Sequence, residues 1–406
     1  MRGNAMPDQA LPAGVPALDL DPFCRDFFDD PYPHHEAVRE AAPVVWLPRI
    51  GCYGTGRYEE VRAMLMDWES FVSSRGVGLT DYKTHPPYRG PSLVLETDPP
   101  LHTNRRAVMN AVLSPAVIRE LRPGFAAAAE GLAERVVAMG ACDGVRDIAE
   151  AYPLSVFPDA VGMTPHGREC LLPYGNFVFN SMGPRNARLE ASLAELAPLN
   201  DWVMRQCRRD ELTQDGIGAA IYAAADRGEI AAEEAPLLVR SLLSAGVDTT
   251  VNGIGAALWC LARFPDQWDR LRADPSLARN AFEEAIRFES PVQTFFRTTA
   301  RDVALGGTAV PEGRKVLMFL AAANRDPRRW DQPDAYLIDR AASGHVGFGA
   351  GIHLCVGQVL ARLEGELILS ALARRVARLE IAAEPVRRYN NTLRGLRSLP
   401  LRLHAG

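Results

Sequence analysis

A single cysteine flanked by glycines is the strongest chemical signal in this sequence. The segment reads Phe348-Gly349-Ala350-Gly351-Ile352-His353-Leu354-Cys355-Val356-Gly357. Apolar spacing predicts a helix over residues 357–376, so Cys355 lies just before a helix N-terminus. Backbone N–H groups and the positive end of a helix both stabilise a thiolate. The segment therefore suits a cysteine in its reactive, metal-binding form.

Three interpretations of this segment follow from its residues. A thiolate suits haem iron, to which it donates electron density that favours cleavage of an O–O bond. A lone glycine-rich segment also fits a buried cysteine or a phosphate-binding loop. The phosphate loop fails in detail, because a G-x-G-x-x-G pattern beginning at Gly347 needs glycine at position 352, where the chain has Ile352.

A second group of polar residues interrupts a long apolar helix. Residues 233–264 are predicted to form one helix, because apolar side chains recur along them at helical spacing. Within it, Ala245-Gly246-Val247-Asp248-Thr249-Thr250 brings several poor helix formers together. A threonine hydroxyl can donate to the carbonyl four residues earlier and bend the helix. Taken alone, the segment fits a tolerated kink as well as a reactive site.

Both segments resemble motifs of the cytochrome P450 family. The haem-binding signature F-G-x-G-x-H-x-C-x-G is matched at every fixed position, and residues 245–250 resemble the oxygen-activation motif A/G-G-x-D/E-T-T. The resemblance implies a haem b whose axial iron ligand is Cys355, with His353 reaching a haem propionate. It also implies that Asp248 carries protons inward and that Thr249 holds water or an oxygen species by hydrogen bonds. The further haem-binding residues that it implies are Ala245, Phe348, Gly349 and Gly357.

Charged residues elsewhere match further features of the same family. Glu284 and Arg287 form its E-x-x-R pair, a buried structural pair that supports the haem-binding core. His102 and Arg106 form an H-x-x-x-R motif, and Arg297 stands where relatives place another propionate-binding arginine. Such residues neutralise buried carboxylates through charge-assisted hydrogen bonds. Each of them alone would fit an ordinary surface charge.

The expected substrate residues resemble those of the bacterial P450 subgroup that oxidises para-substituted benzoates such as 4-methoxybenzoate. Residues 241, 245 and 249 share one helix face, which the resemblance places on the distal side of the haem. The expected polar anchors are Arg89, Ser92, Arg240, Ser241 and Ser244, and the expected apolar walls are Phe179, Met182, Val292, Phe295 and Phe296. Relatives have phenylalanine near the place of Met182, so this flexible side chain should change which para substituent fits.

The elements that must position these residues are mainly helical. Further helices are predicted over residues 104–138 and 188–209, where Ala, Leu and Arg dominate. Residues 72–97 lack periodicity, which indicates a long loop forming a wall or lid of a site. Residues 44–65 are predicted to form a short strand, a Gly-rich turn at residues 51–56 and then a helix that carries Tyr58, Val61, Met64 and Leu65, and residues 301–319 are predicted to form short strands.

Composition limits the class of protein. No composition break divides the chain, so one haem-binding domain is expected over residues 1–406, with an extended N-terminal segment at residues 1–29. The resemblance implies a triangular, mainly α-helical P450 fold with a minor β region. Lys and Arg number 45 against 50 Asp and Glu, a net charge of −5, which excludes a global basic field for nucleic acid. No apolar stretch approaches the roughly 20 residues that cross a bilayer, so no membrane span is expected.

Cysteine usage indicates the compartment and the electron supply. The seven cysteines contain no C-x-x-C pair, which argues against disulfides, structural zinc or an iron–sulfur cluster. Residues 1–23 lack the apolar core of a signal peptide, so a bacterial cytoplasmic location is expected. Electrons should come from a separate [2Fe–2S] ferredoxin and its NAD(P)H-dependent reductase. This partner should dock on the Cys355 side, where basic residues such as Arg362 would meet it.

The activity implied by the resemblance is insertion of one oxygen atom of O₂ into a small organic substrate. With 4-methoxybenzoate this gives O-demethylation to 4-hydroxybenzoate and formaldehyde. One alternative is a P450 acting on another small hydrophobic substrate, such as a terpenoid. Two others are a haem-thiolate enzyme that uses peroxide and a haem-binding gas sensor or carrier. The Asp248-Thr249 pair argues against the last two.

Overall fold

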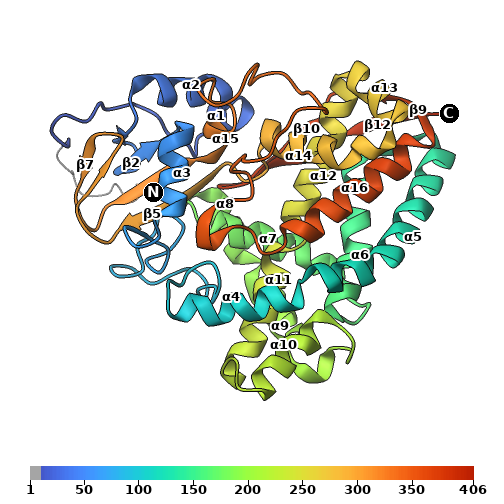
Figure 1. Cartoon of the computed structure of the whole chain (residues 1–406), viewed down its shortest axis with the longest axis horizontal. Coiled ribbons are helices and arrows are strands. Elements are labelled where there is room, and N and C mark those ends of the chain that lie inside the picture. Colours follow the sequence, from blue (N-terminus) through green and yellow to red (C-terminus); the bar gives the residue numbers. More distant parts are fainter. Residues whose placement is uncertain (1–10) are drawn as a thin grey trace.

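The protein has a triangular outline built mainly from helices (Figure 1). The computed structural model describes residues 11–406. The α-helices are α1 (Arg25–Asp29), α2 (Tyr32–Ala41), α3 (Tyr58–Met66), α4 (Leu101–Val112), α5 (Pro115–Met139), α6 (Ala151–Val161), α7 (Leu171–Asn180), α8 (Ala187–Ala194), α9 (Leu196–Gln206), α10 (Ile217–Asp226), α11 (Ala235–Ala245), α12 (Asp248–Arg263), α13 (Pro265–Ala273), α14 (Ala278–Glu289), α15 (Leu320–Ala323) and α16 (Gln358–Ala373). The predicted mainly helical, triangular fold is confirmed.

The strands form small sheets, as the predicted minor β region requires. The largest sheet has the order β1 (Val45–Leu47), β2 (Cys52–Thr55), β8 (Lys315–Phe319), β5 (Thr294–Thr299) and β3 (Phe71–Val72). The other pairings join β4 (Ala141–Asp143) and β9 (Val376–Ile381) to β12 (Pro400–Ala405), β6 (Val303–Leu305) to β7 (Thr308–Val310), and β10 (Val386–Tyr389) to β11 (Arg394–Ser398). β2 and β8 run parallel, with Tyr53 opposite Val316. The largest sheet occupies one corner of the triangle, and α9 and α10 lie at the lower corner (Figure 1).

Several predicted helices are divided in the structure. The helix expected over residues 104–138 is split into α4 and α5, because Pro115 starts a new helix at its first position. The helix expected over residues 188–209 is split into α8 and α9. Within residues 1–29, expected to be extended, residues 25–29 form α1, and residues 1–10 lie outside the described range. The long loop at residues 72–97 is confirmed.

The helix predicted over residues 233–264 is also interrupted. α11 ends at Ala245 and α12 begins at Asp248, with Gly246 and Val247 between them. Thr249 Oγ1 donates to the carbonyl of Ala245 at 2.8 Å, which is the predicted bond from a threonine to the carbonyl four residues earlier. The polar residues therefore break the helix where the sequence predicted a bend.

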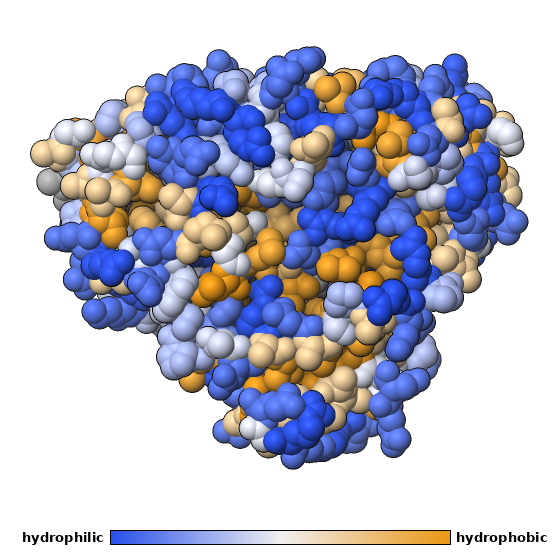
Figure 2. Space-filling view, in the orientation of Figure 1, coloured by the Kyte–Doolittle hydropathy of each residue, from blue (hydrophilic) through white to orange (hydrophobic). Residues whose placement is uncertain are grey.

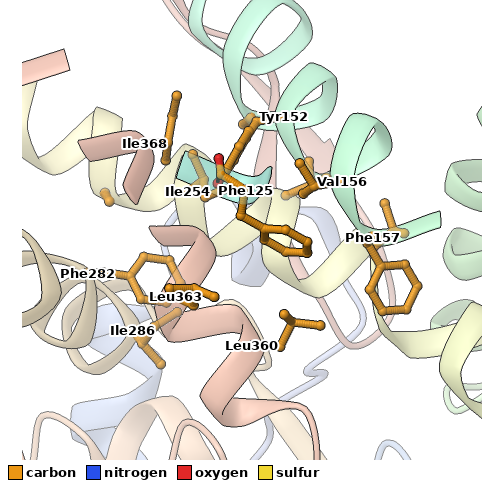
Figure 3. Packing of buried hydrophobic residues seen from close by; sticks show 14 of the residues in the cluster. Phe125, Tyr152, Val156, Phe157, Ile254, Phe282, Ile286, Leu360, Leu363 and Ile368 are labelled. Carbon is orange, nitrogen blue, oxygen red and sulfur yellow. Dashed lines mark hydrogen bonds between the residues drawn. The ribbon is translucent and has the colours of Figure 1, made fainter. Parts of the chain in front are cut away.

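Figure 3 shows part of the main core, where buried apolar side chains from several helices pack together. The residues labelled there are Phe125, Tyr152, Val156, Phe157, Ile254, Phe282, Ile286, Leu360, Leu363 and Ile368. They come from α5, α6, α12, α14 and α16, so the core joins segments that are far apart in the chain. Among residues 11–406, no helix is long and apolar enough to span a membrane.

Candidate active site

A cavity of about 250 Å³ collects most of the residues that the sequence predicts to act together. The predicted residues on its wall are Arg89, Ser92, Arg106, Phe179, Met182, Arg240, Ser241, Ser244, Ala245, Thr249, Val292, Phe295, Arg297, Phe348, Gly349, His353, Cys355 and Gly357. Two further predicted residues, His102 and Asp248, are buried but are not part of the wall. On the face drawn in Figure 2, apolar side chains gather near the centre and hydrophilic ones surround them.

Cys355 lies at one end of the cavity in a turn closed by its own backbone. Its N–H donates to the carbonyl of Phe348 at 2.8 Å. Gly351 has a φ of +66°, and a side chain at this position would collide with the carbonyl of Leu65. Burial raises the pKa of the Cys355 thiol, whereas the N–H of Gly357 and the charge of Arg106 act in the opposite direction. A buried thiol of this kind is readily deprotonated by a coordinated cation.

Cationic and unpartnered polar groups surround the Cys355 end. Arg297 is 4% exposed, and within residues 11–406 its guanidinium donates to the neighbouring carbonyl of Phe296 at 3.0 Å. Burial lowers the pKa of Arg297 to about 10, and it forms no ion pair within residues 11–406. The Nε2 atoms of His102 and His353 are buried without a hydrogen-bond partner in the described chain. Buried polar groups of this kind need hydrogen-bond partners, and the two propionates of a haem held by Cys355 would supply them.

His102 and His353 pack against each other at the edge of this cradle. Their ring centroids are 4.5 Å apart. Burial and the neighbouring His353 lower the pKa of His102 to about 4, so its imidazole is neutral near pH 7. His353 Nε2 is 3.9 Å from Asp98 Oδ1, which is beyond hydrogen-bond distance. The Nε2 atoms of both rings therefore have no partner in the described chain and would suit a propionate.

Asp248 is held behind the cavity by a cation from the C-terminal region. Its side chain is 2% exposed, and Arg388 Nη1 donates to Asp248 Oδ1 at 3.1 Å. Burial raises the pKa of Asp248, while Arg388 opposes the rise and Glu150 adds to it. Since Arg388 is 24% exposed, it links the buried carboxyl to solvent. This placement fits the proton-carrying role predicted for Asp248, and Thr249 lies on the cavity side of the same turn.

The predicted E-x-x-R pair is fully buried. Glu284 and Arg287 are each 0% exposed, and Arg287 Nε lies 2.7 Å from Glu284 Oε2. Arg287 also donates to three backbone carbonyls, those of Asn324, Pro333 and Ala335. One pair thus joins α14 to the segment that leads into the Cys355 loop.

Arg362 is not the free cation that the docking prediction needs. It makes two hydrogen bonds of 2.7 Å to Glu283 and is only 17% exposed. Its guanidinium carbon lies 4.4 Å from the centre of the Phe348 ring. Because Glu283 already balances its charge, Arg362 does not present a free charge to a partner. Its guanidinium instead packs on the Phe348 ring and supports the Cys355 loop.

The opposite end of the cavity is polar, and Arg89 is paired there. Its Nη1 and Nη2 donate to Glu96 at 2.8 and 3.1 Å. The prediction of Arg89 as an anchoring charge is therefore modified, because its charge is already compensated. Arg240 Nη2 donates to the carbonyl of Pro91 at 2.8 Å, and Arg240 forms no ion pair within residues 11–406. Ser92 Oγ and Ser241 Oγ lie 3.4 Å apart between the two arginines.

Apolar side chains form the wall between the two ends. Phe179, Met182, Val292 and Phe295 line it as predicted. The prediction of Phe296 as a further wall residue is wrong, because it packs in a separate core cluster on the other face of β5. Neighbouring residues of a strand point to opposite faces, so Phe295 and Phe296 cannot both face the cavity.

Sequence reasoning missed three acidic or basic partners of the site. Glu96 pairs with Arg89, Arg388 with Asp248, and Glu283 with Arg362. Glu96 follows Arg89 by seven residues in a loop without periodicity, and the other two partners come from distant parts of the chain. No local pattern marks them, because none shares a helix face with its partner.

A buried carboxyl in α16 leads to a prediction about stability. Glu364 lines the cavity, and both of its oxygens lack a partner in the described chain. Burial raises the pKa of Glu364 well above 4.5, so its stabilising contribution is complete at low pH and is lost as pH rises through the folded-state pKa. The loss occurs between pH 4.5, the ordinary pKa of the group, and its folded-state pKa. In this range the wild type should lose up to about 1.4 kcal/mol of unfolding free energy per pH unit relative to Glu364→Gln.

Urea unfolding of both proteins at pH 5, 6, 7 and 8 measures this difference. The matched variant Glu366→Gln, on the same helix, controls for the loss of a carboxyl. A constant difference between wild type and Glu364→Gln across the four pH values would contradict the prediction.

Comparison with known proteins identifies the family. Residues 201–392 match the sequence model of the family described as Cytochrome P450. The chain is 62% identical to cytochrome P450 CYP199A2 of Rhodopseudomonas palustris over 96% of this chain and 95% of that protein. Its fold is similar to that of cytochrome P450 CREJ in complex with (4-ethylphenyl) dihydrogen phosphate, with a TM-score of 0.83, 25% identity, and 95% and 99% of the two chains covered.

An intact type IV self-sufficient cytochrome P450 monooxygenase is also similar. Its TM-score is 0.82 at 26% identity, and the match covers 95% of this chain but 52% of that one. These matches confirm the predicted P450 fold and its haem cofactor. The chain belongs to the cytochrome P450 family, and it is a haem monooxygenase.

Proposed function

We propose that the enzyme oxidises a small aromatic carboxylate, a para-substituted benzoate such as 4-methoxybenzoate. The observation that carries this proposal is the polarity of the cavity. Contacts between the 90–92 segment and α11 gather Arg240, Ser92 and Ser241 on one part of the wall, and the same wall carries Cys355 and the apolar side chains. A flat molecule with an acid group at one end and an apolar group at the other matches this distribution.

Each part of the cavity has a task in this proposal. Arg240 and the two serine hydroxyls bind the carboxylate, since charge-assisted hydrogen bonds to carboxylates are strong. Phe179 and Phe295 bound the ring, and the para substituent points toward the Cys355 end. Exclusion of water by these apolar side chains favours a fixed orientation of the substrate.

The protein groups near Cys355 hold the cofactor and move protons. Cys355 would bind the haem iron, while Arg106, Arg297, His102 and His353 would hold the propionates. Haem supplies the activation of O₂ and the insertion of one of its oxygen atoms. With 4-methoxybenzoate, O₂, two electrons and two protons give 4-hydroxybenzoate, formaldehyde and water. Asp248 would pass the protons inward.

The electrons would come from a [2Fe–2S] ferredoxin and an NAD(P)H-dependent ferredoxin reductase. P450 monooxygenases require an electron donor and O₂, and the self-sufficient relative shows the other arrangement, in a chain about twice as long. A cytoplasmic location is part of the proposal, since all seven cysteines are free thiols. Product formation from NADH in the presence and absence of ferredoxin and reductase tests the electron supply.

An optical titration tests the substrate class. Adding 4-methoxybenzoate to the ferric enzyme should convert low-spin to high-spin haem in a saturable way, because the ligand displaces iron-bound water. Arg240→Gln should weaken this binding at least about tenfold, since it removes the uncompensated charge. Arg272→Gln, on the exposed side of α13, is the matched control. No spin shift in a protein with a normal haem spectrum would refute the benzoate proposal and leave the family assignment intact.

A further inference from the structure

The polar end of the cavity contains two arginines but only one uncompensated charge. Arg89 lines the cavity and is 10% exposed, and both of its terminal nitrogens are bound to Glu96. Arg240 also lines the cavity, but it donates to backbone carbonyls and pairs with no carboxylate of residues 11–406. Arg89, Arg240 and Glu96 together therefore carry one positive unit there. The other arginines on the wall, Arg106 and Arg297, are assigned to the haem propionates.

Glu96 is buried behind Arg89 and is held there by hydrogen bonds. Its side chain is 0% exposed and is absent from the cavity wall. The Tyr82 hydroxyl donates to Glu96 Oε1 at 2.6 Å, and the N–H of Ser92 donates to Oε2 at 2.8 Å. Burial alone would raise the pKa of Glu96, but Arg89 and these two donors hold it below its ordinary value. Glu96 is thus a carboxylate at neutral pH.

One donor of Arg89 takes no part in this pairing. Its Nε is buried and has no hydrogen-bond partner in the described chain. Next to it, Gly90 makes room for the second arginine, because a Cβ at position 90 would lie 2.8 Å from Arg240 Nη1. The two guanidinium groups therefore differ in charge balance: Glu96 neutralises Arg89, whereas no carboxylate of residues 11–406 neutralises Arg240.

We propose that Glu96 is a specificity-determining residue that sets the charge of this end at one positive unit and so selects monoanionic carboxylates over dianionic aryl phosphates. The proposal rests on the proposed function and deepens it. A monoanion is balanced by Arg240, whereas a dianion leaves one negative charge uncompensated in a partly desolvated site. An uncompensated buried charge is strongly unfavourable.

The test compares three ligands of similar shape in wild type and Glu96→Gln. They are 4-methoxybenzoate as the monoanion, 4-ethylphenyl phosphate at pH 8 as the dianion, and 4-methoxyacetophenone as the neutral molecule. An aryl phosphate is mainly dianionic at pH 8, because its second pKa is about 6. Optical titration gives a Kd for each. In Glu96→Gln the ratio of the phosphate Kd to the ketone Kd should fall at least about tenfold, because one positive charge is released beside the ligand.

Two further variants separate charge from disturbance of the loop. Asp81→Asn removes a carboxylate that pairs with Arg75 on the same loop, away from the cavity, and should leave the three Kd values in the wild-type order. The double variant Arg89→Gln/Glu96→Gln has the wild-type net charge and should restore the wild-type preference between the phosphate and the ketone. The ferrous CO spectrum of each variant checks that the haem site is intact.

The outcomes distinguish this proposal from the proposed function. If the ratio of the phosphate Kd to the ketone Kd is the same in Glu96→Gln as in the wild type, the role of Glu96 is overturned. The role is also overturned if the double variant Arg89→Gln/Glu96→Gln has the same ratio as Glu96→Gln. If wild type shows no response to 4-methoxybenzoate, the proposed substrate class fails. The phosphate-to-ketone ratio still decides the role of Glu96 in that case, because it does not involve the benzoate.

Discussion

Replacing Asp248 with asparagine should lower the rate of product formation about 10²- to 10⁴-fold, the usual contribution of a positioned proton donor. Asparagine has nearly the same shape and can still accept the hydrogen bond from Arg388, but it cannot carry a proton. Asp248 is outside the cavity wall, so the Kd of the substrate should stay unchanged. Steady-state turnover with excess ferredoxin, together with an optical titration, measures both quantities.

The solvent isotope effect provides a second readout of the same variant. If proton delivery limits Asp248→Asn, its turnover in D₂O should fall more strongly than that of the wild type. Asp339→Asn is the matched control, because Asp339 is an exposed acid that pairs with Arg270. A turnover near the wild-type rate, or a loss explained entirely by weaker substrate binding, would exclude Asp248 from proton delivery.

Replacing Arg287 with methionine should lower the free energy of unfolding by about 3–5 kcal/mol, the cost of breaking a buried ion pair from one side. Methionine leaves the carboxylate of Glu284 buried with Arg340 as its remaining cation. It also removes a donor from the carbonyls of Asn324, Pro333 and Ala335, of which Ala335 keeps a longer bond from Arg340. The purified variant should hold less haem, because these bonds brace the segment leading to Cys355. Urea unfolding and the haem-to-protein absorbance ratio check both effects.

An exposed arginine gives the comparison for this variant. Arg270 pairs with Asp339 at 2.7 Å, and their side chains are 45% and 53% exposed. Arg270→Met should cost less than about 1 kcal/mol, as expected for a surface ion pair. Equal losses of unfolding free energy in Arg270→Met and Arg287→Met would show that burial does not increase the contribution of the E-x-x-R pair to stability.

The chemistry was predictable because its residues form short motifs. The Cys355 segment, the Asp248-Thr249 pair and Glu284 with Arg287 each lie within ten residues of chain, so spacing alone brings them together. The helix break was predictable in kind, since threonine hydroxyls compete for backbone carbonyls. The extent of the break was not predictable, because a bent helix and two separate helices differ only in the backbone hydrogen bonds around Gly246 and Val247.

Long-range partners and strand pairing were beyond local patterns. Arg388 reaches Asp248 from β10, a strand that the sequence analysis did not predict. β12, near the C-terminus, pairs with β4 from the first half of the chain, and tertiary contacts rather than propensity define such short strands. Phe296 was misplaced because the strand β5 was not recognised, and without its alternation two adjacent phenylalanines look equivalent.

The side chains at the start of α12 also bind the backbone that carries them. Thr249 and Thr250 donate to the carbonyls of Ala245 and Gly246, and Asn252 donates to the carbonyl of Asp248. A substitution in this turn therefore removes a backbone-supporting hydrogen bond as well as a group that takes part in the chemistry. It should lower both stability and activity. The side chains of wall residues such as Phe179 and Met182 are apolar and form no hydrogen bonds of this kind with the backbone. Divergence toward new substrates can proceed through the wall of the cavity while the turn is inherited unchanged.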